Sequence, residues 1–159
     1  MVEVSQFVGV FVLNDERHLG VHGLSETVSN YLQIMKYYLS LGSNINPELN
    51  LDLAIASLSK ILAETKCSSI YKTQAEGFDG DDFLNLIFSG TSSLSFESLN
   101  KQLKDIENSS GRDRNSPKFS SRTLDIDIVL QLSDDEEILF ESDEIVKYRF
   151  VSEPLEEIL

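Results

Sequence analysis

The chain has 159 residues, of which 41% are hydrophobic and 25% are charged, and these ordinary values favour one folded domain over a disordered chain. Its formal net charge of −14 argues against nonspecific binding to nucleic acid or to an anionic membrane surface, and no window approaches the roughly 18 apolar residues that span a bilayer. The single cysteine, Cys67, excludes an internal disulfide, and we expect a small buried thiol in a cytoplasmic protein.

Residues 1–34 are expected to be an N-terminal extension, and residues 35–159 to be the folded domain. The extension lacks the basic region and apolar run of a secretory signal. His18 and His22 have the i, i+4 spacing of a metal site on a helix, but the glycines beside them argue against a helix, and no third ligand is evident. The extension is therefore either an alternative upstream start or the tail of a fused partner.

The spacing of apolar residues and the positions of turn residues predict a strand, a helix and a second strand in the first half of the domain. Tyr37–Ser43 has the pattern of a strand that ends at Gly42, and a turn follows it. Pro47 suits the first turn of a helix, which the apolar spacing continues through residue 64. A second strand is predicted over Cys67–Thr73, and it ends in the loop that contains Gly77 and Gly80.

The second half repeats this order. The predicted elements are a strand over Phe83–Gly90, a helix capped by Ser95 that ends near Gly111, a polar loop to Ser121, a strand over 124–130 with period two, and a short partner strand at Ile138–Phe140. This order predicts an α+β fold of the ferredoxin-like βαββαβ type, an antiparallel sheet with helices packed on its face.

A cationic loop leads into an acidic pair near the centre of the second half. Residues 101–122 hold six of the 13 basic residues and only three acidic ones, including Arg112, Arg114 and Arg122. Asp125 and Asp127 follow, and because they lie two apart on a strand they share one face. Arginine suits phosphate oxygens and paired carboxylates hold Mg²⁺ beside them, so the block predicts a nucleotide-triphosphate site. Taken alone, the aspartates would fit an ordinary half-exposed strand, and the arginines a solvated loop.

Five segments together resemble one known family. They are LGSN at 41–44, SIYKTQAEG at 69–77, DFLN at 82–85, IENSSGRDR at 106–114 and RTLDIDIVL at 122–130. They resemble 6-hydroxymethyl-7,8-dihydropterin pyrophosphokinase of folate biosynthesis, over about 37–159. The resemblance implies a ferredoxin-like fold and transfer of the β,γ-diphosphate of ATP to the hydroxymethyl group of the pterin, with release of AMP.

The same resemblance implies roles for the residues of the charged block. Asp125 and Asp127 would hold two Mg²⁺ ions, and Arg112 and Arg122 would act with them on the transferred phosphates. The residues implied to bind ATP are Glu107, Arg114, Arg122 and Ile128. For Glu107, an exposed carboxylate at a helix end is an alternative of nearly equal weight.

Four further residues are implied to bind the pterin: Thr73, Asn85, Phe119 and Phe150. Asn85 carries both a donor and an acceptor, which suits the amide-like edge of the ring, and the two phenylalanines could sandwich a flat heterocycle. Phe150 has the alternative of a core residue. Gly42, Ser43 and Asn44 are expected to shape the first turn and support the pocket.

Several positions depart from the family pattern. The usual two prolines of the second block are Gln74 and Ala75, the tryptophan of the arginine loop is Phe119, and a Pro-His segment is absent at 141–143. Arg149 stands one position from the expected arginine, and one residue of shift in an extended segment reverses the face of a side chain. A catalytically impaired relative that binds nucleotide or pterin in a regulatory role is therefore the alternative function. An RNA-binding module is disfavoured because the basic face is lacking. Fusion or association with other folate-pathway enzymes stays open.

Overall fold

The computed structural model describes residues 33–75, 77, 79–111, 115 and 120–159. Its elements, in chain order, are β1 (Met35–Ser43), α2 (Pro47–Ile61), β2 (Ala63–Cys67), β3 (Tyr71–Thr73), β4 (Phe83–Ser92), α3 (Phe96–Ser109), β5 (Asp125–Leu132), β6 (Ile138–Glu141), α4 (Glu144–Lys147) and α5 (Arg149–Ile158).

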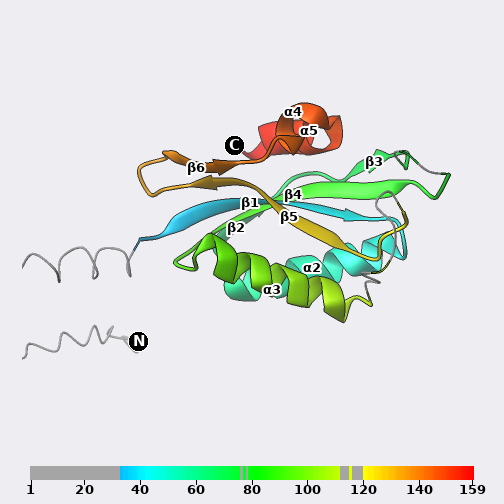
Figure 1. Ribbon diagram of the computed structural model, residues 1–159, viewed down its shortest axis with the longest axis horizontal. Helices are drawn as coiled ribbons and strands as arrows, with labels where there is room; N and C mark the ends of the chain where they lie inside the picture. Colours follow the sequence, from blue (N-terminus) through cyan, green and yellow to red (C-terminus); the bar gives the residue numbers. More distant parts are fainter. Residues whose placement is uncertain (1–32, 76, 78, 112–114, 116–119) are drawn as a thin grey trace, which may run out of the picture.

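The strands form one antiparallel sheet in the order β2-β4-β1-β5-β6, and β3 pairs with the other end of β4 (Figure 1). The central strand β1 therefore lies between β4 and β5, which arrive from distant parts of the chain. This arrangement confirms the predicted antiparallel sheet of the ferredoxin-like type.

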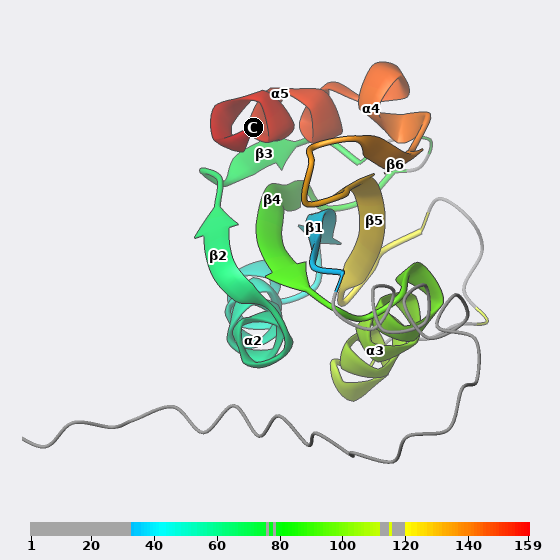
Figure 2. The ribbon, with the colours of Figure 1, turned by 90° about the vertical axis from the view of Figure 1, so that its left-hand side faces the viewer.

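The main core lies between the sheet and the two long helices α2 and α3, which cover the same face (Figures 1 and 2). Alternate β1 residues such as Leu39 and Leu41 point toward these helices and are fully buried. Asn46, in a left-handed conformation, precedes Pro47 at the start of α2, and the side chain of Ser95 accepts a hydrogen bond from the Ser98 N–H at the start of α3. The predicted helix starts are therefore correct.

The opposite face of the sheet is covered by α4 and α5, which the sequence did not reveal (Figure 2). Val151 and Leu155 of α5 pack on Tyr38, Ile87 and Val129 of the three central strands. The helical spacing of apolar residues in α5 did not lead to a predicted helix, because the segment is acidic and contains Pro154. Helices therefore flank the sheet on both faces, rather than on the one face that the sequence pattern predicted.

The connection after α2 differs from the prediction. The helix ends at Ile61 rather than at residue 64, and the expected strand over 67–73 is replaced by two shorter strands, β2 and β3. Ser68 forms the break, because its Oγ accepts a hydrogen bond from the Ile87 N–H and its own N–H donates to the Ile87 carbonyl. Cys67 is exposed, so the expected buried thiol is wrong.

Tyr37 of β1 is expected to make the folded domain less stable as the pH rises above 10. Its side chain is fully buried, its hydroxyl donates to the Leu94 carbonyl at 2.6 Å, and burial followed by the charge of Glu97 raises its pKa to about 12. Because the folded pKa lies above the unfolded value near 10, this stabilisation is complete below pH 10 and is lost between pH 10 and about 12. Urea denaturation should show that the wild type loses up to about 2 kcal/mol more than Tyr37→Phe over this range. Parallel stability curves for the two proteins would contradict the assignment.

Candidate active site

Two rows of residues cross the central strands on the face that α5 partly covers. In one row Asn85 of β4, Gly42 of β1 and Asp125 of β5 are direct cross-strand partners. In the next, Ser40 of β1 is the partner of Asp127. Because Ser40 and Gly42 have small side chains, they leave a hollow above β1, between the polar side chains of β4 and β5. The hollow brings the predicted acidic pair beside the predicted amide.

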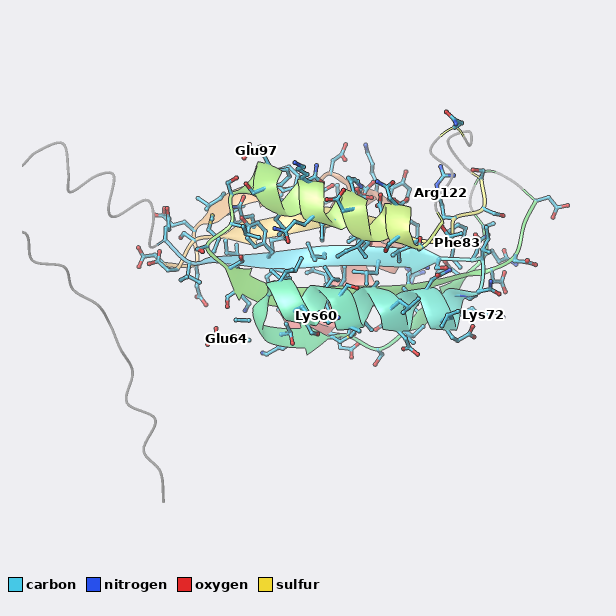
Figure 3. The ribbon with its side chains drawn as sticks, turned by 90° about the horizontal axis from the view of Figure 1, so that it is seen from below. Lys60, Glu64, Lys72, Phe83, Glu97 and Arg122 are labelled. Carbon is cyan, nitrogen blue, oxygen red and sulfur yellow. The ribbon has the colours of Figure 1, made fainter. Side chains whose placement is uncertain are left out.

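A cavity of about 220 Å³ occupies this hollow. Its walls come from the sheet, from the loop before β5, and from α4 and the start of α5. The lining residues are Ser40, Gly42, Thr73, Gln74, Phe83, Asn85, Ser120, Arg122, Asp125, Asp127, Glu144, Tyr148 and Phe150. Figure 3 shows Arg122 and Phe83 at the same end of the molecule, away from Glu97 and Glu64 at the other end. Six residues singled out from the sequence thus line one cavity, namely Thr73, Asn85, Arg122, Asp125, Asp127 and Phe150.

The acidic pair offers a donor set that suits Mg²⁺. Asp125 and Asp127 are both half-buried, and the Asp127 side chain keeps 48% of its surface exposed. Within the described ranges, no group of three or more His, Cys, Asp and Glu side chains is arranged to hold a metal ion by itself. Mg²⁺ is commonly held by one or two carboxylates together with substrate phosphates and water, so two aspartates beside Arg122 fit this ion.

Glu107 lies behind the acidic pair and does not line the cavity. It is fully buried, so the alternative of an exposed carboxylate at a helix end is wrong. Its Oε1 accepts hydrogen bonds from the Ile126 N–H at 2.8 Å and from the Lys104 ammonium at 3.0 Å. Ile128, also implied to bind ATP, is buried in the core between the sheet and helices α2 and α3.

Lys104 on α3 was not singled out from the sequence. Its ammonium donates to Glu107, to the Ile126 carbonyl at 3.1 Å and to Asp127 Oδ1 at 3.2 Å. Burial by itself would lower its pKa, but the charges of Asp127 and Glu107 and hydrogen bonds to both leave the pKa above its ordinary value. Lys104 is therefore a fixed positive charge beside the acidic pair. The spacing of three residues between Lys104 and Glu107 was the available signal.

The loop before β5 is held by Asn44, which lies after β1. The Arg122 N–H donates to Asn44 Oδ1 at 2.7 Å, and the Asn44 N–H donates to the Arg122 carbonyl at 3.0 Å. Asn44 Nδ2 also donates to the carbonyl of Asp81 at 3.0 Å. This clasp fixes the backbone of Arg122 at the cavity rim. Arg112, Arg114 and Phe119, three of the predicted site residues, lie outside the described residues.

Asn85 is held in one orientation at the other end of the cavity. Its Nδ2 donates to Thr73 Oγ1 at 2.8 Å, and the side chain is nearly fully buried. A Cβ added at Gly42 would lie 3.0 Å from Asn85 Oδ1, which is tighter than an ordinary contact. Gly42 therefore leaves room for Asn85 Oδ1, and both residues line the cavity.

Two aromatic rings form the wall contributed by the C-terminal helices. Tyr148 and Phe150 stack with centroids 4.9 Å apart and an angle of 16° between their planes. Arg149 between them is exposed and bonds to Glu153 rather than to the cavity. Both neighbours of Arg149, Tyr148 and Phe150, line the cavity, and Arg149 does not. Tyr148 is not among the site residues that the sequence predicted, because its contact with Phe150 forms only at the start of α5.

Glu144 of α4 adds a third carboxylate to the cavity wall. Burial, followed by the charges of Asp127, Asp125 and Asp143, raises the pKa of the Glu144 carboxyl above its ordinary value. Among the described residues, three carboxylates and two cations, Arg122 and Lys104, therefore lie at this end of the cavity. An anionic ligand would need a metal ion to bind here, because bare carboxylates repel it.

Comparisons with known proteins agree with the geometry. A family model for 7,8-dihydro-6-hydroxymethylpterin-pyrophosphokinase matches residues 38–159. A 2-amino-4-hydroxy-6-hydroxymethyldihydropteridine pyrophosphokinase of Aquifex aeolicus is 36% identical over 95 residues, which are 58% of this chain and 59% of that relative. The protein of the same name from Haemophilus influenzae is 34% identical over 130 residues, 76% of this chain and 79% of the relative.

A third relative of that name, from Synechocystis, is 38% identical over 94 residues, which cover 57% of this chain and 48% of the relative. The chain thus spans about half to three-fifths of the length of two of these relatives. Among the helices of the described residues, none has the length and apolar character needed to cross a membrane.

Proposed function

The chain belongs to the 7,8-dihydro-6-hydroxymethylpterin-pyrophosphokinase family, and from this premise we propose that it transfers diphosphate from ATP to 6-hydroxymethyl-7,8-dihydropterin. The product would be the pterin diphosphate of folate biosynthesis, and AMP would be released. The observation that carries this proposal is the single cavity that joins Asp125, Asp127 and Arg122 at one end to Asn85 and Phe150 at the other.

In this reaction the hydroxymethyl oxygen of the pterin attacks the β-phosphorus of ATP. The bond from that phosphorus to the oxygen shared with the α-phosphate breaks, AMP leaves, and the hydroxyl proton is lost to solvent or a nearby base. Asp125 and Asp127 would hold two Mg²⁺ ions, which would neutralise the charge of the triphosphate when bound. Arg122 at the rim suits the phosphate oxygens, and we propose the same for Arg112 and Arg114.

The pterin would occupy the end of the cavity beside β3 and β4. A pterin ring presents adjacent donors and acceptors, and a fixed amide such as that of Asn85 can satisfy both kinds of group. Phe150 and Tyr148 offer a flat stacked wall, so one ring face would lie against an aromatic side chain. We propose Thr73 as the residue that orients Asn85, and Phe119 as a further stacking partner.

The test is an incubation of the protein with ATP, Mg²⁺ and 6-hydroxymethyl-7,8-dihydropterin, followed by separation of the nucleotides. The proposal expects AMP without ADP, and it expects AMP only when the pterin is present. Formation of ADP would indicate transfer of a single phosphoryl group. No AMP above a blank without enzyme would refute the function.

Replacing Asn85 with alanine should weaken pterin binding more than it slows turnover. The amide is buried and fixed by Thr73, so its loss leaves polar ring atoms without partners and should raise the KM for the pterin by about ten- to hundredfold. Steady-state kinetics at saturating ATP give this value, and Asn100→Ala is the control, because Asn100 is half-buried on α3 and does not line the cavity. An unchanged KM for the pterin would remove Asn85 from the site.

Two observations favour a second candidate, a catalytically impaired relative that binds nucleotide or pterin in a regulatory role. Glu144 faces the acidic pair, and Arg149 lies outside the cavity. Both features reduce the positive charge that a triphosphate would meet. Binding of nucleotide or pterin without AMP formation would favour this candidate.

The remaining proposals concern context. We propose that residues 35–159 are the catalytic domain and that residues 1–34 are an extension to it. A cytoplasmic location is proposed because the one cysteine fits a reducing compartment. Fusion or association with other enzymes of folate biosynthesis is proposed on family grounds alone.

A further inference from the structure

Among the described residues, no strand pairs with the outer edge of β5 where it carries the acidic pair. β6 pairs with Leu130, Gln131 and Leu132, so it ends before the start of β5. Two side chains of α3 form hydrogen bonds with the backbone at this edge instead. Glu107 accepts from the Ile126 N–H at 2.8 Å, and Lys104 donates to the Ile126 carbonyl at 3.1 Å. Helix α3 is thereby fastened to the strand segment between the two aspartates.

The fastening brings one cation into contact with the predicted metal ligand. Lys104 Nζ lies 3.2 Å from Asp127 Oδ1, and the Lys104 side chain is 31% exposed. Three acceptors on three different groups fix the position of the ammonium: Glu107, the Ile126 carbonyl and Asp127. The bond to Asp127 uses one carboxylate oxygen, which leaves Oδ2 for a cation. Asp127 is therefore oriented before any ligand arrives.

The positive charge of Lys104 has opposite effects on two ligands, the free metal ion and the metal–nucleotide complex. A free divalent cation is repelled by it, whereas the complex of such a cation with a nucleoside triphosphate is net negative and is attracted. Among the described residues, the other charges that act on this space are Asp125, Asp127 and Glu144 of the cavity wall and Glu107 beside Lys104, all negative, and Arg122 at the rim. Without Lys104, the balance of charge on the described residues would shift toward binding of the free ion and away from the complex.

We propose that Lys104 is a positioning and specificity-determining residue that makes the acidic pair select the metal–nucleotide complex over the free metal ion. It does so by holding Asp127 through Oδ1 and by adding one positive charge next to it. The inference rests on the proposed function, because a nucleotide must be the anion that arrives. It assigns to Lys104 no contact with the reacting atoms.

The test measures two affinities in the full chain at pH 8. Mn²⁺ serves as the probe ion, followed by electron paramagnetic resonance, first alone and then with α,β-methylene-ATP, in which the bond to be broken is blocked. For Lys104→Gln we expect Mn²⁺ alone to bind as tightly as in the wild type or up to several-fold more tightly. We expect the Mn²⁺–nucleotide complex to bind about three- to tenfold more weakly.

Weaker binding of the complex without weaker binding of Mn²⁺ alone is the signature of a charge effect, because a general loss of structure weakens both affinities together. Lys101→Gln, on the same helix but exposed, should leave both affinities unchanged. Lys104→Arg keeps the charge and should keep the wild-type ratio of the two affinities. Parallel weakening in Lys104→Gln, or no change in either affinity, would overturn the proposal.

A second variant guards against misfolding of the first. Lys104→Met combined with Glu107→Gln neutralises both partners, so no unpaired charge is left buried, and such paired replacements are often tolerated. Because Lys104 touches Asp127 and Glu107 does not line the cavity, the complex is again expected to bind more weakly while Mn²⁺ alone does not, with a smaller change than in Lys104→Gln. Equal shifts in the same direction would count against the proposal.

The outcomes separate this inference from the proposed function. If the wild type binds the Mn²⁺–nucleotide complex and forms AMP, but Lys104→Gln has wild-type affinities, the inference alone fails. If the binding shifts occur as expected but no AMP forms with the pterin, the proposed transferase function fails and the charge role of Lys104 stands.

Discussion

Replacing Asp127 with asparagine should lower the rate of AMP formation by about a thousandfold or more while leaving the fold intact. The substitution keeps the shape of the side chain but removes the charge that would hold Mg²⁺ against the triphosphate. Such an ion lowers the barrier to phosphoryl transfer by several kcal/mol, and each 1.36 kcal/mol corresponds to a factor of about ten in rate. The measurement is kcat at saturating ATP and pterin over a range of Mg²⁺ concentrations.

The stability of this variant should change little, because both partners of the Lys104–Asp127 ion pair are partly exposed. Pairs of this kind contribute about 1 kcal/mol or less. Asp52→Asn, on the exposed side of α2, is the matched control and should keep wild-type turnover. Full activity of the Asp127 variant would show that the metal lies elsewhere.

Replacing Glu107 with alanine should lower the free energy of unfolding by about 3–5 kcal/mol, the usual effect of removing one partner from a buried charged pair. The Glu107 carboxylate is fully buried and bonds to both Lys104 and the Ile126 N–H. Its loss leaves the ammonium without one of its carboxylates and the strand edge without its acceptor. Urea denaturation monitored by circular dichroism gives the value.

Two variants on the same helix sharpen this result. Asp105→Ala removes an exposed carboxylate and should change stability by about 0.5 kcal/mol or less. Glu107→Gln keeps an acceptor for Ile126 and should cost less than Glu107→Ala. A loss below about 1 kcal/mol in Glu107→Ala would mean that the buried carboxylate is not a structural fastener.

The fold was predictable where local sequence signals and burial agree. The alternation in β5 predicted its strand and the shared face of Asp125 and Asp127, and Pro47 and Ser95 marked the helix starts correctly. The family that five sequence segments resemble is confirmed by the family model over residues 38–159. These features depend on neighbours within a few positions along the chain, so one sequence is enough to read them.

Other features depend on contacts between distant segments. Nothing near Glu107 in the sequence predicts that it would be buried against Ile126, 19 residues later. Likewise, the apolar residues of α5 are explained only by their packing on the second face of the sheet, which local sequence does not show. Ser68 interrupts the expected second strand because it bonds to Ile87 of another strand. Tertiary partners decide such cases, and local propensity does not reveal them.

The clasp made by Asn44 has a consequence for the order of events during folding. It joins the end of the first strand to Asp81, 37 residues later, and to Arg122, 78 residues later. Loops of this length must close before the cavity rim exists, and closing them is slow compared with forming a helix. A chain emerging during synthesis therefore has no rim until β5 has been made and docked. Ligand bound at that rim stabilises only the completed native state, and its effect on unfolding reports on the whole domain rather than on one loop.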